Sequence, residues 1–298
     1  MAACSSQQQL TDSAPAPRIW DVRTGRFVSE PQLIADLAPA RYRLLGEVHD
    51  NPAHHAIRAR LISEIAAQGA HPAVVFEQFD LDQDGALTAA QAAGGDAERL
   101  ADAGRLDRNG WRWPLHKAII EAALAMHLRV RAGNLSRAEL RADGPVAAAD
   151  NAHAIGRARL AAAHWTEVQA RQLRAEIIES HCGVLPEAVV PRLVLAQRER
   201  DAAMAQALVD DATNDGAILI AGNGHVRADR GVPVYLHAPG LAVADARSVS
   251  LGFVEVGPTD ERAAGFPRQV VADHPGFDYL WLTGTVARDD PCAAIHAP

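Results

Sequence analysis

Short apolar runs alternate along the chain with longer stretches in which apolar side chains recur at helical spacing. The runs 73–76 (AVVF) and 217–220 (AILI) show no polar alternation, which is typical of parallel strands buried on both faces. We expect strands at residues 43–48, 73–79, 128–133, 217–221, 232–237, 248–256 and 279–283. Because helical patterns such as 114–126 lie between them, the sequence predicts an α/β fold with a mainly parallel sheet flanked by helices.

Residues 151–211 interrupt this alternation. They carry only helical patterns, at 152–180 and 186–209, with Cys182-Gly183 as the break between them. Such a length of chain without a strand signal predicts a smaller helical subdomain inserted into the α/β domain. We therefore expect a flexible N-terminal tether at 1–17, an α/β domain formed by 18–150 and 212–298, and the helical subdomain at 151–211.

The composition is that of a globular protein with a sizeable core. Of the 298 residues, 48% are hydrophobic and 22% are charged, which excludes a disordered or coiled-coil chain. The net charge of -8 argues against a general nucleic-acid-binding protein, so we expect no nucleic acid among its partners. Thirteen histidines offer many imidazoles for ligation or proton transfer.

Polar residues that can carry chemistry follow four of the expected strands. Glu47 and His49 follow the first strand two residues apart, so that both point to the same face. Glu77 lies near the end of the second strand, Asn134 follows the third, and Gly222-Asn223-Gly224-His225 follow the fourth. Because ligands of an open parallel sheet bind at the carboxyl ends of its strands, we expect a shared crevice there. Taken singly, each residue also has a structural explanation as a turn, a cap or a satisfied loop histidine.

Further candidates lie on the helices around this edge. His54 begins the helix after the first strand and is either part of the crevice or a buried, hydrogen-bonded histidine. Gln197, Arg200 and Asp201 form a polar stripe that either faces solvent or turns toward the sheet. We assign ten residues to a catalytic or ligand-binding crevice: Glu47, His49, His54, Glu77, Asn134, Gln197, Arg200, Asp201, Asn223 and His225.

The cysteines bear on the cellular compartment. Cys4 follows small residues and precedes a polar stretch, which resembles the end of a bacterial lipobox and predicts a lipid anchor on Cys4; the alternative is an incidental cysteine in an ordinary N-terminus. Cys182 and Cys292 can pair in an oxidising compartment or remain two free thiols.

Residues 80–91 (DLDQDGALTAAQ) fit most of the calcium loop of an EF-hand. The last position is Gln91, where a bidentate glutamate is needed, and a strand precedes the segment where a helix is needed. We interpret it as an Asp-rich loop after a strand, with calcium binding as the alternative.

Several of these segments resemble a known family. Residues 44–55 (LLGEVHDNPAHH) are similar to the opening motif of the ChaN-type haem-binding lipoproteins, whose superfamily also contains Tiki-type metal-dependent proteases and erythromycin esterases. Four further segments are similar to the family: residues 76–79, 109–134, 181–186 with 197–204, and 221–236. The resemblance therefore runs from about residue 41 to 236, with a weaker match around 278–283.

The resemblance implies an α/β domain with a smaller helical one, a lipid anchor in the bacterial cell envelope and a role in haem or iron uptake. It also implies an outer-membrane haem receptor or haem transport system as partner, and a homodimer that holds haem between its subunits. Family members can use a Tyr as axial ligand of the iron, in a segment where this chain has His116. We take His181, His116 and Tyr235 as candidate axial ligands.

Two functions follow from these residues. The first is a haem-binding protein, which we favour because the resemblance along the chain is closest to the haem carriers. The second is a hydrolase in which Glu47, His49, Glu77 and His225 hold a divalent metal such as zinc, manganese or cobalt, or in which Glu47 and His49 act on water as a general base pair.

Overall fold

The computed structural model describes residues 18–141, 151–244, 246–257, 259–260, 268–290 and 292–293. The predicted tether 1–17 and its candidate lipidation site Cys4 lie outside the described residues. Within the described part of the chain, no helix is both long and apolar enough to cross a membrane.

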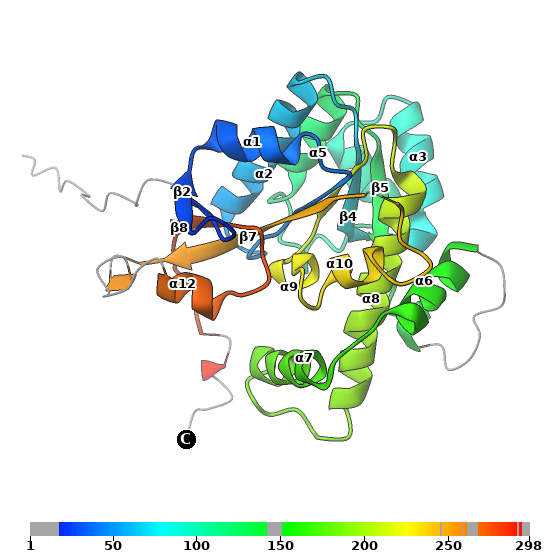
Figure 1. Ribbon diagram of the computed structural model, residues 1–298. Coiled ribbons are helices and arrows are strands. Elements are labelled where there is room, and N and C mark those ends of the chain that lie inside the picture. The colour runs from blue at the N-terminus through cyan, green and yellow to red at the C-terminus, as the bar shows by residue number, and fades with distance from the viewer. Residues whose placement is uncertain are drawn as a thin grey trace, which may run out of the picture.

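One mixed sheet forms the centre of the molecule, with the strand order β2-β1-β8-β7-β3-β6-β4-β5 (Figure 1). Its strands are β1 (Arg18–Asp21), β2 (Arg26–Val28), β3 (Tyr42–Leu45), β4 (Ala73–Asp80), β5 (Val130–Asn134), β6 (Ala217–Ile220), β7 (Ser248–Val256) and β8 (Tyr279–Gly284). The strands from β8 to β5 pair in parallel, whereas β1 is antiparallel to both β8 and β2. The expected α/β fold with a mainly parallel sheet is therefore confirmed.

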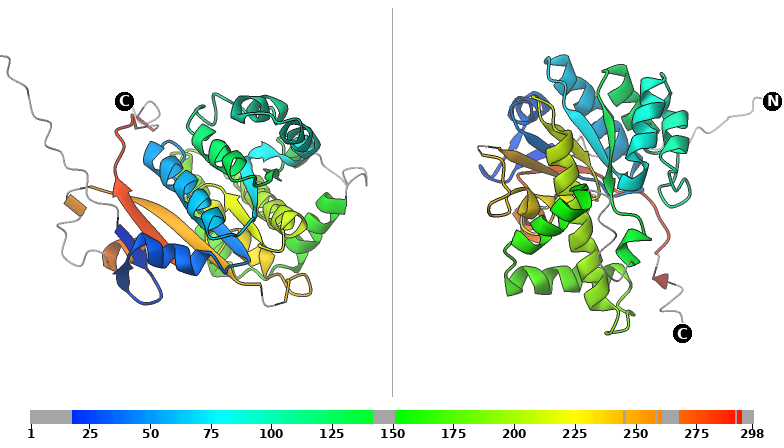
Figure 2. Two further views of the ribbon diagram at one scale, coloured as in Figure 1. Left: turned by 90° about the horizontal axis from the view of Figure 1, so that it is seen from above. Right: turned by 90° about the vertical axis from the view of Figure 1, so that its right-hand side faces the viewer.

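Helices cover both faces of the sheet (Figures 1 and 2). They are α1 (Glu30–Leu37), α2 (Pro52–Ala67), α3 (Asp84–Ala92), α4 (Ala97–Ala103), α5 (Lys117–Ala125), α6 (Asn151–Ala162), α7 (Glu167–Ser180), α8 (Val190–Asp211), α9 (Asn223–Val226), α10 (Val232–Leu236) and α12 (Arg268–Asp273). Helices α1 to α5 share one core cluster with the sheet, and α8 and α10 share the other. The two faces of β3 show why two layers are needed: Leu45 packs into the first cluster and its neighbour Leu44 into the second.

The start of α2 places three side chains under the carboxyl end of β3. Asn51 accepts a hydrogen bond from the backbone N of Ala53 at 3.0 Å, and Pro52 occupies the first helical position. The helix therefore begins within seven residues of the end of β3, so that its first two turns carry His54, His55 and Arg58 back toward the sheet edge.

The segment 232–237, expected to be a strand, is helix α10, so this prediction is wrong. Pro233 has no N–H to give to a β-ladder but is well suited to the first turn of a helix, which begins after Gly231. Val232 and Tyr235 are buried against the second core cluster, so the apolar character of the run reflects burial and not a strand.

Residues 80–91 form neither a calcium loop nor an open Asp-rich loop, and this expectation is wrong as well. They comprise the end of β4, a 3-10 turn at Leu81–Gln83 and most of α3. Asp84 pairs with Arg131 at 2.5 Å, and Gln91 accepts a hydrogen bond from the backbone of Val130 at 3.1 Å. These polar side chains therefore attach α3 to β5.

The segment 151–211 contains α6, α7 and α8. The second half of α8 is buried on the sheet through residues such as Met204 and Leu208, whereas α7 lies beyond it, away from the sheet (Figure 1). A disulfide joins Cys182, just after α7, to Cys292, which settles the choice between paired and free thiols. The assignment of 151–211 as a separate subdomain stays a prediction.

Candidate functional site

Glu47 is buried at the carboxyl end of β3, with only 2% of its surface exposed. Its carboxylate is surrounded by five nitrogen-bearing side chains: His49 Nδ1 at 2.7 Å, His55 Nδ1 at 3.2 Å, His116 Nε2 at 3.3 Å, Gln78 Nε2 at 3.4 Å and the Arg58 guanidinium. They come from the loop after β3, from α2, from β4 and from the N-terminus of α5. The fold thus keeps this carboxylate away from water among donor groups, except that Nδ1 of His55 faces it as an acceptor.

Arg58 supplies the positive charge of this cluster. It is fully buried, and burial lowers its pKa to about 9, so it remains a cation at neutral pH. Its guanidinium contacts Glu47 Oε2 and donates from Nη2 to His55 Nδ1 at 3.0 Å. It therefore balances the buried carboxylate and fixes the tautomer of His55, whose Nε2 donates to the carbonyl of His49 at 3.0 Å.

This arrangement decides whether the cluster can hold a metal ion. Among the described residues, only Glu47, His55 and His116 offer three ligand atoms that all lie within 4.8 Å of one another. Arg58 already contacts Oε2 of Glu47 and donates to Nδ1 of His55. A divalent cation would have to displace a buried guanidinium, so this set of donors does not fit a metal.

A second charged cluster surrounds His225 on α9. Its Nδ1 lies 2.6 Å from Asp201 of α8, and its Nε2 lies 3.2 Å from Glu77 of β4. Burial alone would lower the pKa of His225, but the two carboxylates outweigh it and raise this pKa to about 10. Burial raises the pKa of Asp201 to about 6, whereas for Glu77 the imidazolium and the N–H of Gly222 outweigh burial and lower the pKa well below its usual range. His225 is therefore an imidazolium that donates from both nitrogens.

The four residues predicted as metal ligands thus form two hydrogen-bonded pairs, His49 with Glu47 and His225 with Glu77. The pairs meet at Gly222, where an added Cβ would lie 2.9 Å from His49 Nε2 and 3.7 Å from Glu77 Oε2. Among the described residues, the quartet does not bring three ligand atoms within 4.8 Å of one another, so it is not a preassembled metal site.

His49 differs from the other histidines of the site because half of its side-chain surface, 50%, is exposed. Its Nδ1 donates to Glu47, since an ionised carboxylate can only accept. Its ring packs edge-to-face on Trp111, with the centroids 5.1 Å apart. The other ring nitrogen, Nε2, is thereby left for a ligand from outside.

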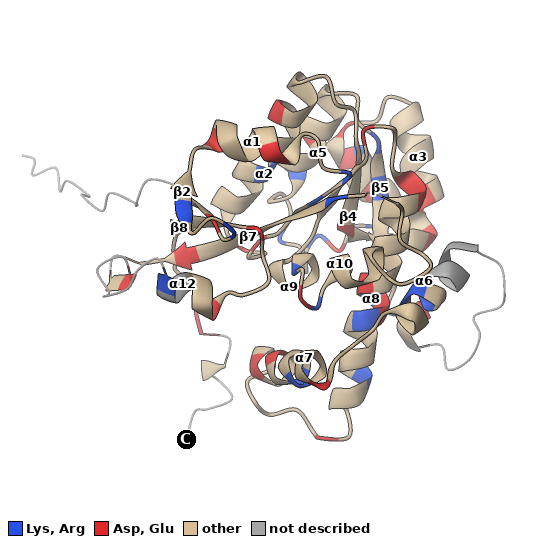
Figure 3. Ribbon diagram, viewed as in Figure 1, with Lys and Arg blue, Asp and Glu red and all other residues tan. Residues whose placement is uncertain are grey.

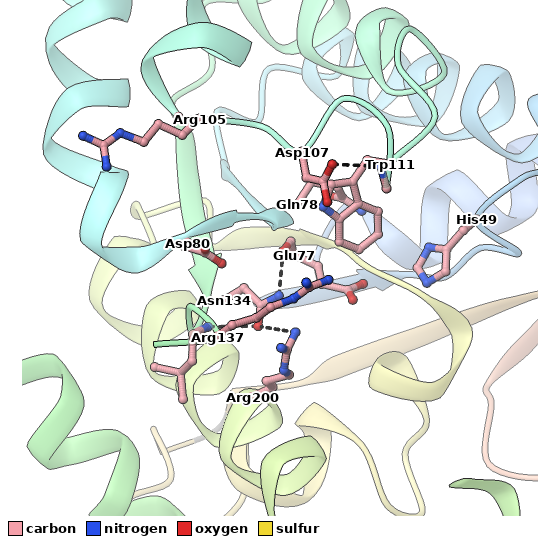
Figure 4. Close-up of a pocket in the computed structure, with 13 residues that line it drawn as sticks. His49, Glu77, Gln78, Asp80, Arg105, Asp107, Trp111, Asn134, Arg137 and Arg200 are labelled. Carbon is pink, nitrogen blue, oxygen red and sulfur yellow. Dashed lines mark hydrogen bonds between the residues drawn. The ribbon is translucent and has the colours of Figure 1, made fainter. Parts of the chain in front are cut away.

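Two cavities meet at His49 and Glu77. The larger, about 560 Å³, extends toward α8 and the loop after β5 and is lined by Trp111, Asn134, Arg137 and Arg200 among others (Figure 4). The smaller, about 500 Å³, lies between the sheet edge and α7 and is lined by residues that include Leu173, Ile177, Gln197 and His225. Both volumes lie in the range of small-molecule and cofactor sites.

The remaining crevice candidates take different places. Asn134 lies in the larger cavity and donates to the carbonyl of Glu77 at 3.0 Å, and Gln197 lies 3.2 Å from His225 Nδ1. His54 is fully buried behind the site, where it accepts from Val48 N and contacts Thr283 Oγ1 at 2.8 Å. Asn223 binds both the N–H and the carbonyl of Phe253. His54 and Asn223 therefore hold the loops; Asn223 also lines the smaller cavity, whereas His54 lines neither.

The three candidate axial ligands also lie in different parts of the structure. Tyr235 is fully buried among Trp165 and Arg198, and burial raises the pKa of its phenol well above its usual range. His116 is buried with its Nε2 on Glu47. His181 is exposed at the end of α7, with Nδ1 bonded to the carbonyl of Ile177 at 2.7 Å. None of the three lines either cavity.

Sequence reasoning missed Arg58, His55 and Gln78 as partners of Glu47. A signal for the first two was present: His55 and Arg58 lie three residues apart on α2, which places them on one face of that helix. Nothing in the sequence indicates that this face turns to Glu47, because that depends on how α2 packs on β3.

These features define a class of protein: an α/β protein with a Glu/His-rich crevice at the carboxyl edge of its sheet. The family described as haem-binding uptake, Tiki superfamily, ChaN matches residues 33–236, and the chain belongs to it. None of the curated proteins compared matches this chain.

Among solved structures, the chain is similar to ChaN of Campylobacter jejuni with bound cofacial haem, at 20% identity and a TM-score of 0.69, covering 92% of this chain and 98% of that one. It also resembles the type III effector HopBA1, at 12% identity and a TM-score of 0.45, covering 85% of this chain and 92% of that one. The first similarity confirms the fold.

Proposed function

We propose that this protein binds haem and takes part in haem or iron uptake, with His49 as the ligand of the iron. Membership of a haem-binding uptake family supports the first part. The observation that carries the second is His49 itself, a half-exposed imidazole at the junction of two cavities, oriented by a buried carboxylate.

The residues around His49 fit a haem iron. Imidazole is a common axial ligand, and ligand histidines usually donate their other N–H to a carboxylate or carbonyl, which raises their basicity. His49 makes this contact through Nδ1 to Glu47 at 2.7 Å. Trp111, edge-on to His49, offers an apolar wall for a porphyrin. By contrast, Tyr235 and His116 would need the core to open before they reached an iron.

Titration of the purified protein with haemin tests this proposal. We expect wild type to shift the Soret band, and His49→Ala to lose the wild-type spectrum and weaken binding by at least about tenfold. Gly222→Ala gives a second test without touching His49, because the new Cβ would lie 2.8 Å from His49 Cε1 and turn the ring away.

Gly224→Ala is the matched control, since its Cβ would meet nothing closer than Glu176 Oε1 at 3.7 Å. It should bind haemin as wild type does. No Soret shift in wild type would contradict the proposed function, whereas unchanged spectra in both His49→Ala and Gly222→Ala would contradict only the role of His49.

We extend the proposal to location: the protein carries a lipid on Cys4 and resides in the bacterial cell envelope or periplasm. We extend it also to partners: it exchanges haem with an outer-membrane haem receptor or haem transport system, and it forms a homodimer. The Cys182–Cys292 disulfide supports an oxidising compartment such as the periplasm. The cofacial haem of ChaN of Campylobacter jejuni is the reason for including the homodimer.

A hydrolase is the second candidate, in a form without metal. The contact between His49 Nδ1 and Glu47 favours it, because an imidazole oriented by a carboxylate can act as a general base on water. A metal-dependent form is disfavoured by the contact of Arg58 with Glu47, and the four predicted ligands do not bring three ligand atoms within 4.8 Å of one another. Absence of ester or peptide hydrolysis by the purified wild-type protein would remove this candidate.

A further inference from the structure

Two arginines face the larger cavity without an acidic partner. Arg137 follows β5, and Arg200 lies on α8. Both side chains extend into the cavity beside Asn134, whereas Arg105, which also lines it, turns away (Figure 4). Neither Arg137 nor Arg200 forms an ion pair with a carboxylate among the residues that the structure describes, although other arginines near the sheet, such as Arg58 and Arg131, do.

Arg200 is positioned by a buried anchor. Its Nη1 lies 3.5 Å from Asn134 Oδ1. Asn134 is itself buried and held at both ends of its amide: Nδ2 donates to the carbonyl of Glu77 at 3.0 Å, and Oδ1 accepts from Leu135 N at 2.9 Å. Asn134, at the end of β5, therefore holds the guanidinium of Arg200 at the cavity.

Two of the three acidic side chains of the same cavity are occupied elsewhere, and the third, Asp80, forms no ion pair with either arginine among the described residues. Glu77 pairs with His225 and accepts a hydrogen bond from Gly222 N at 2.7 Å. Asp107 accepts from Gly110 N in its own loop at 2.9 Å. Asp80 is attracted to both arginines, but burial still raises its pKa above the usual range. The two guanidinium groups are therefore left to bind an anion from outside.

We propose that Arg137 and Arg200 bind the carboxylate groups of the ligand in this cavity, and that for haem these are the propionates. The forked guanidinium group matches a carboxylate with two parallel hydrogen bonds. His49 and the two arginines line the same cavity, and Trp111 packs against His49 there. One planar ligand with an acidic edge can therefore contact His49 with its centre and the arginines with its carboxylates. This inference rests on the proposed function.

The test compares haemin with its dimethyl ester, which keeps the ring and the iron but lacks the propionate charges. Wild type should bind haemin more tightly than the ester by on the order of tenfold or more. The double variant Arg137→Gln/Arg200→Gln should lose this preference while keeping the Soret position, because His49 is intact. Arg171→Gln is the control: Arg171 is an exposed arginine of α7, 67% exposed, paired with Glu167.

The outcomes are distinguishable. If wild type does not discriminate between the two porphyrins, or if the double variant still does, the inference is wrong and haem binding stands. If wild type binds neither porphyrin, the proposed function and the assignment to propionates both fail. In that case a rise of Tm with succinate in wild type, absent from the double variant, would still support a carboxylate site, and no rise would remove it.

Discussion

Glu47 and His49 show how much of the site can be inferred from single residues. Their position after an apolar strand indicates that they share one face at the carboxyl edge of a sheet, and the structure places them 2.7 Å apart. The partner that sets the chemistry of Glu47 is Arg58, whose long side chain reaches back from the second turn of α2. A local pattern contains no information on that contact, because it depends on the packing of a helix on a strand.

The buried histidines predict how stability depends on pH. Burial lowers the pKa of His54 to about 4 and the pKa values of His55 and His116 to about 3, from 6.5. The unfolded chain therefore takes up three protons that the folded chain refuses, so the free energy of unfolding should fall as the pH drops below 6.5. Asp201 and Asp211, whose pKa values burial raises to about 6, oppose this loss below pH 6 but are fewer.

On the alkaline side His225 acts in the opposite sense. Its pKa is raised to about 10, so its stabilising contribution is complete below 6.5 and is lost as the pH rises toward 10. Urea unfolding between pH 4 and 10 should show a maximum near pH 6.5–7, and His225→Gln should flatten the alkaline limb. A wild-type stability that stays constant from pH 7 to 10 would contradict the charged state assigned to His225.

At the scale of elements, strands with uniformly apolar sequence were predicted well, because β4 and β6 are central and buried on both faces. The edge strand β2 and its neighbour β1 were missed: they are short, and β2 is only partly covered. The error at α10 arises because an apolar run indicates burial and does not by itself distinguish a strand from a buried helix.

The disulfide links Cys182, just after α7, to Cys292 near the C-terminus. It closes a loop of 110 residues in sequence, which restricts the unfolded chain. We expect Cys182→Ser/Cys292→Ser to lower the free energy of unfolding by about 2–5 kcal/mol. Chemical denaturation with and without reductant measures this: the reductant should destabilise wild type and leave the double variant unchanged. Equal sensitivity of the two proteins would contradict the pairing.

At the scale of the molecule, charged residues and exposed apolar residues are distributed differently. Figure 3 shows Lys and Arg interspersed with Asp and Glu along the ribbon on both sides of the sheet. Exposed large apolar side chains instead gather on α7, α8 and their connection: Val168, Val184, Val189 and Leu195. Other residues of α7 and α8, such as Ile177 and Gln197, line the smaller cavity, and we call the surface of these four exposed residues the α7/α8 face.

We therefore expect haemin to convert a monomer into a dimer through this face. Sedimentation velocity with and without one equivalent of haemin measures the change. Val184→Asp/Leu195→Asp should prevent the haemin-dependent dimer and leave the haemin-free protein folded, because both side chains are exposed. Val243→Asp, an exposed apolar position elsewhere, is the control and should dimerise. A sedimentation coefficient that haemin does not alter would contradict the proposed homodimer.

The sequence by itself determined the fold class, the positions of the parallel strands apart from the false strand at 232–237, and the edge where Glu47, His49, Glu77 and His225 lie. These properties depend on local periodicity and on residues adjacent in the chain. Only the tertiary structure decided which groups are charged, which histidine is accessible and which arginines lack a partner. Those properties depend on burial and on contacts between distant segments, such as Arg58 with Glu47 and Asp201 with His225.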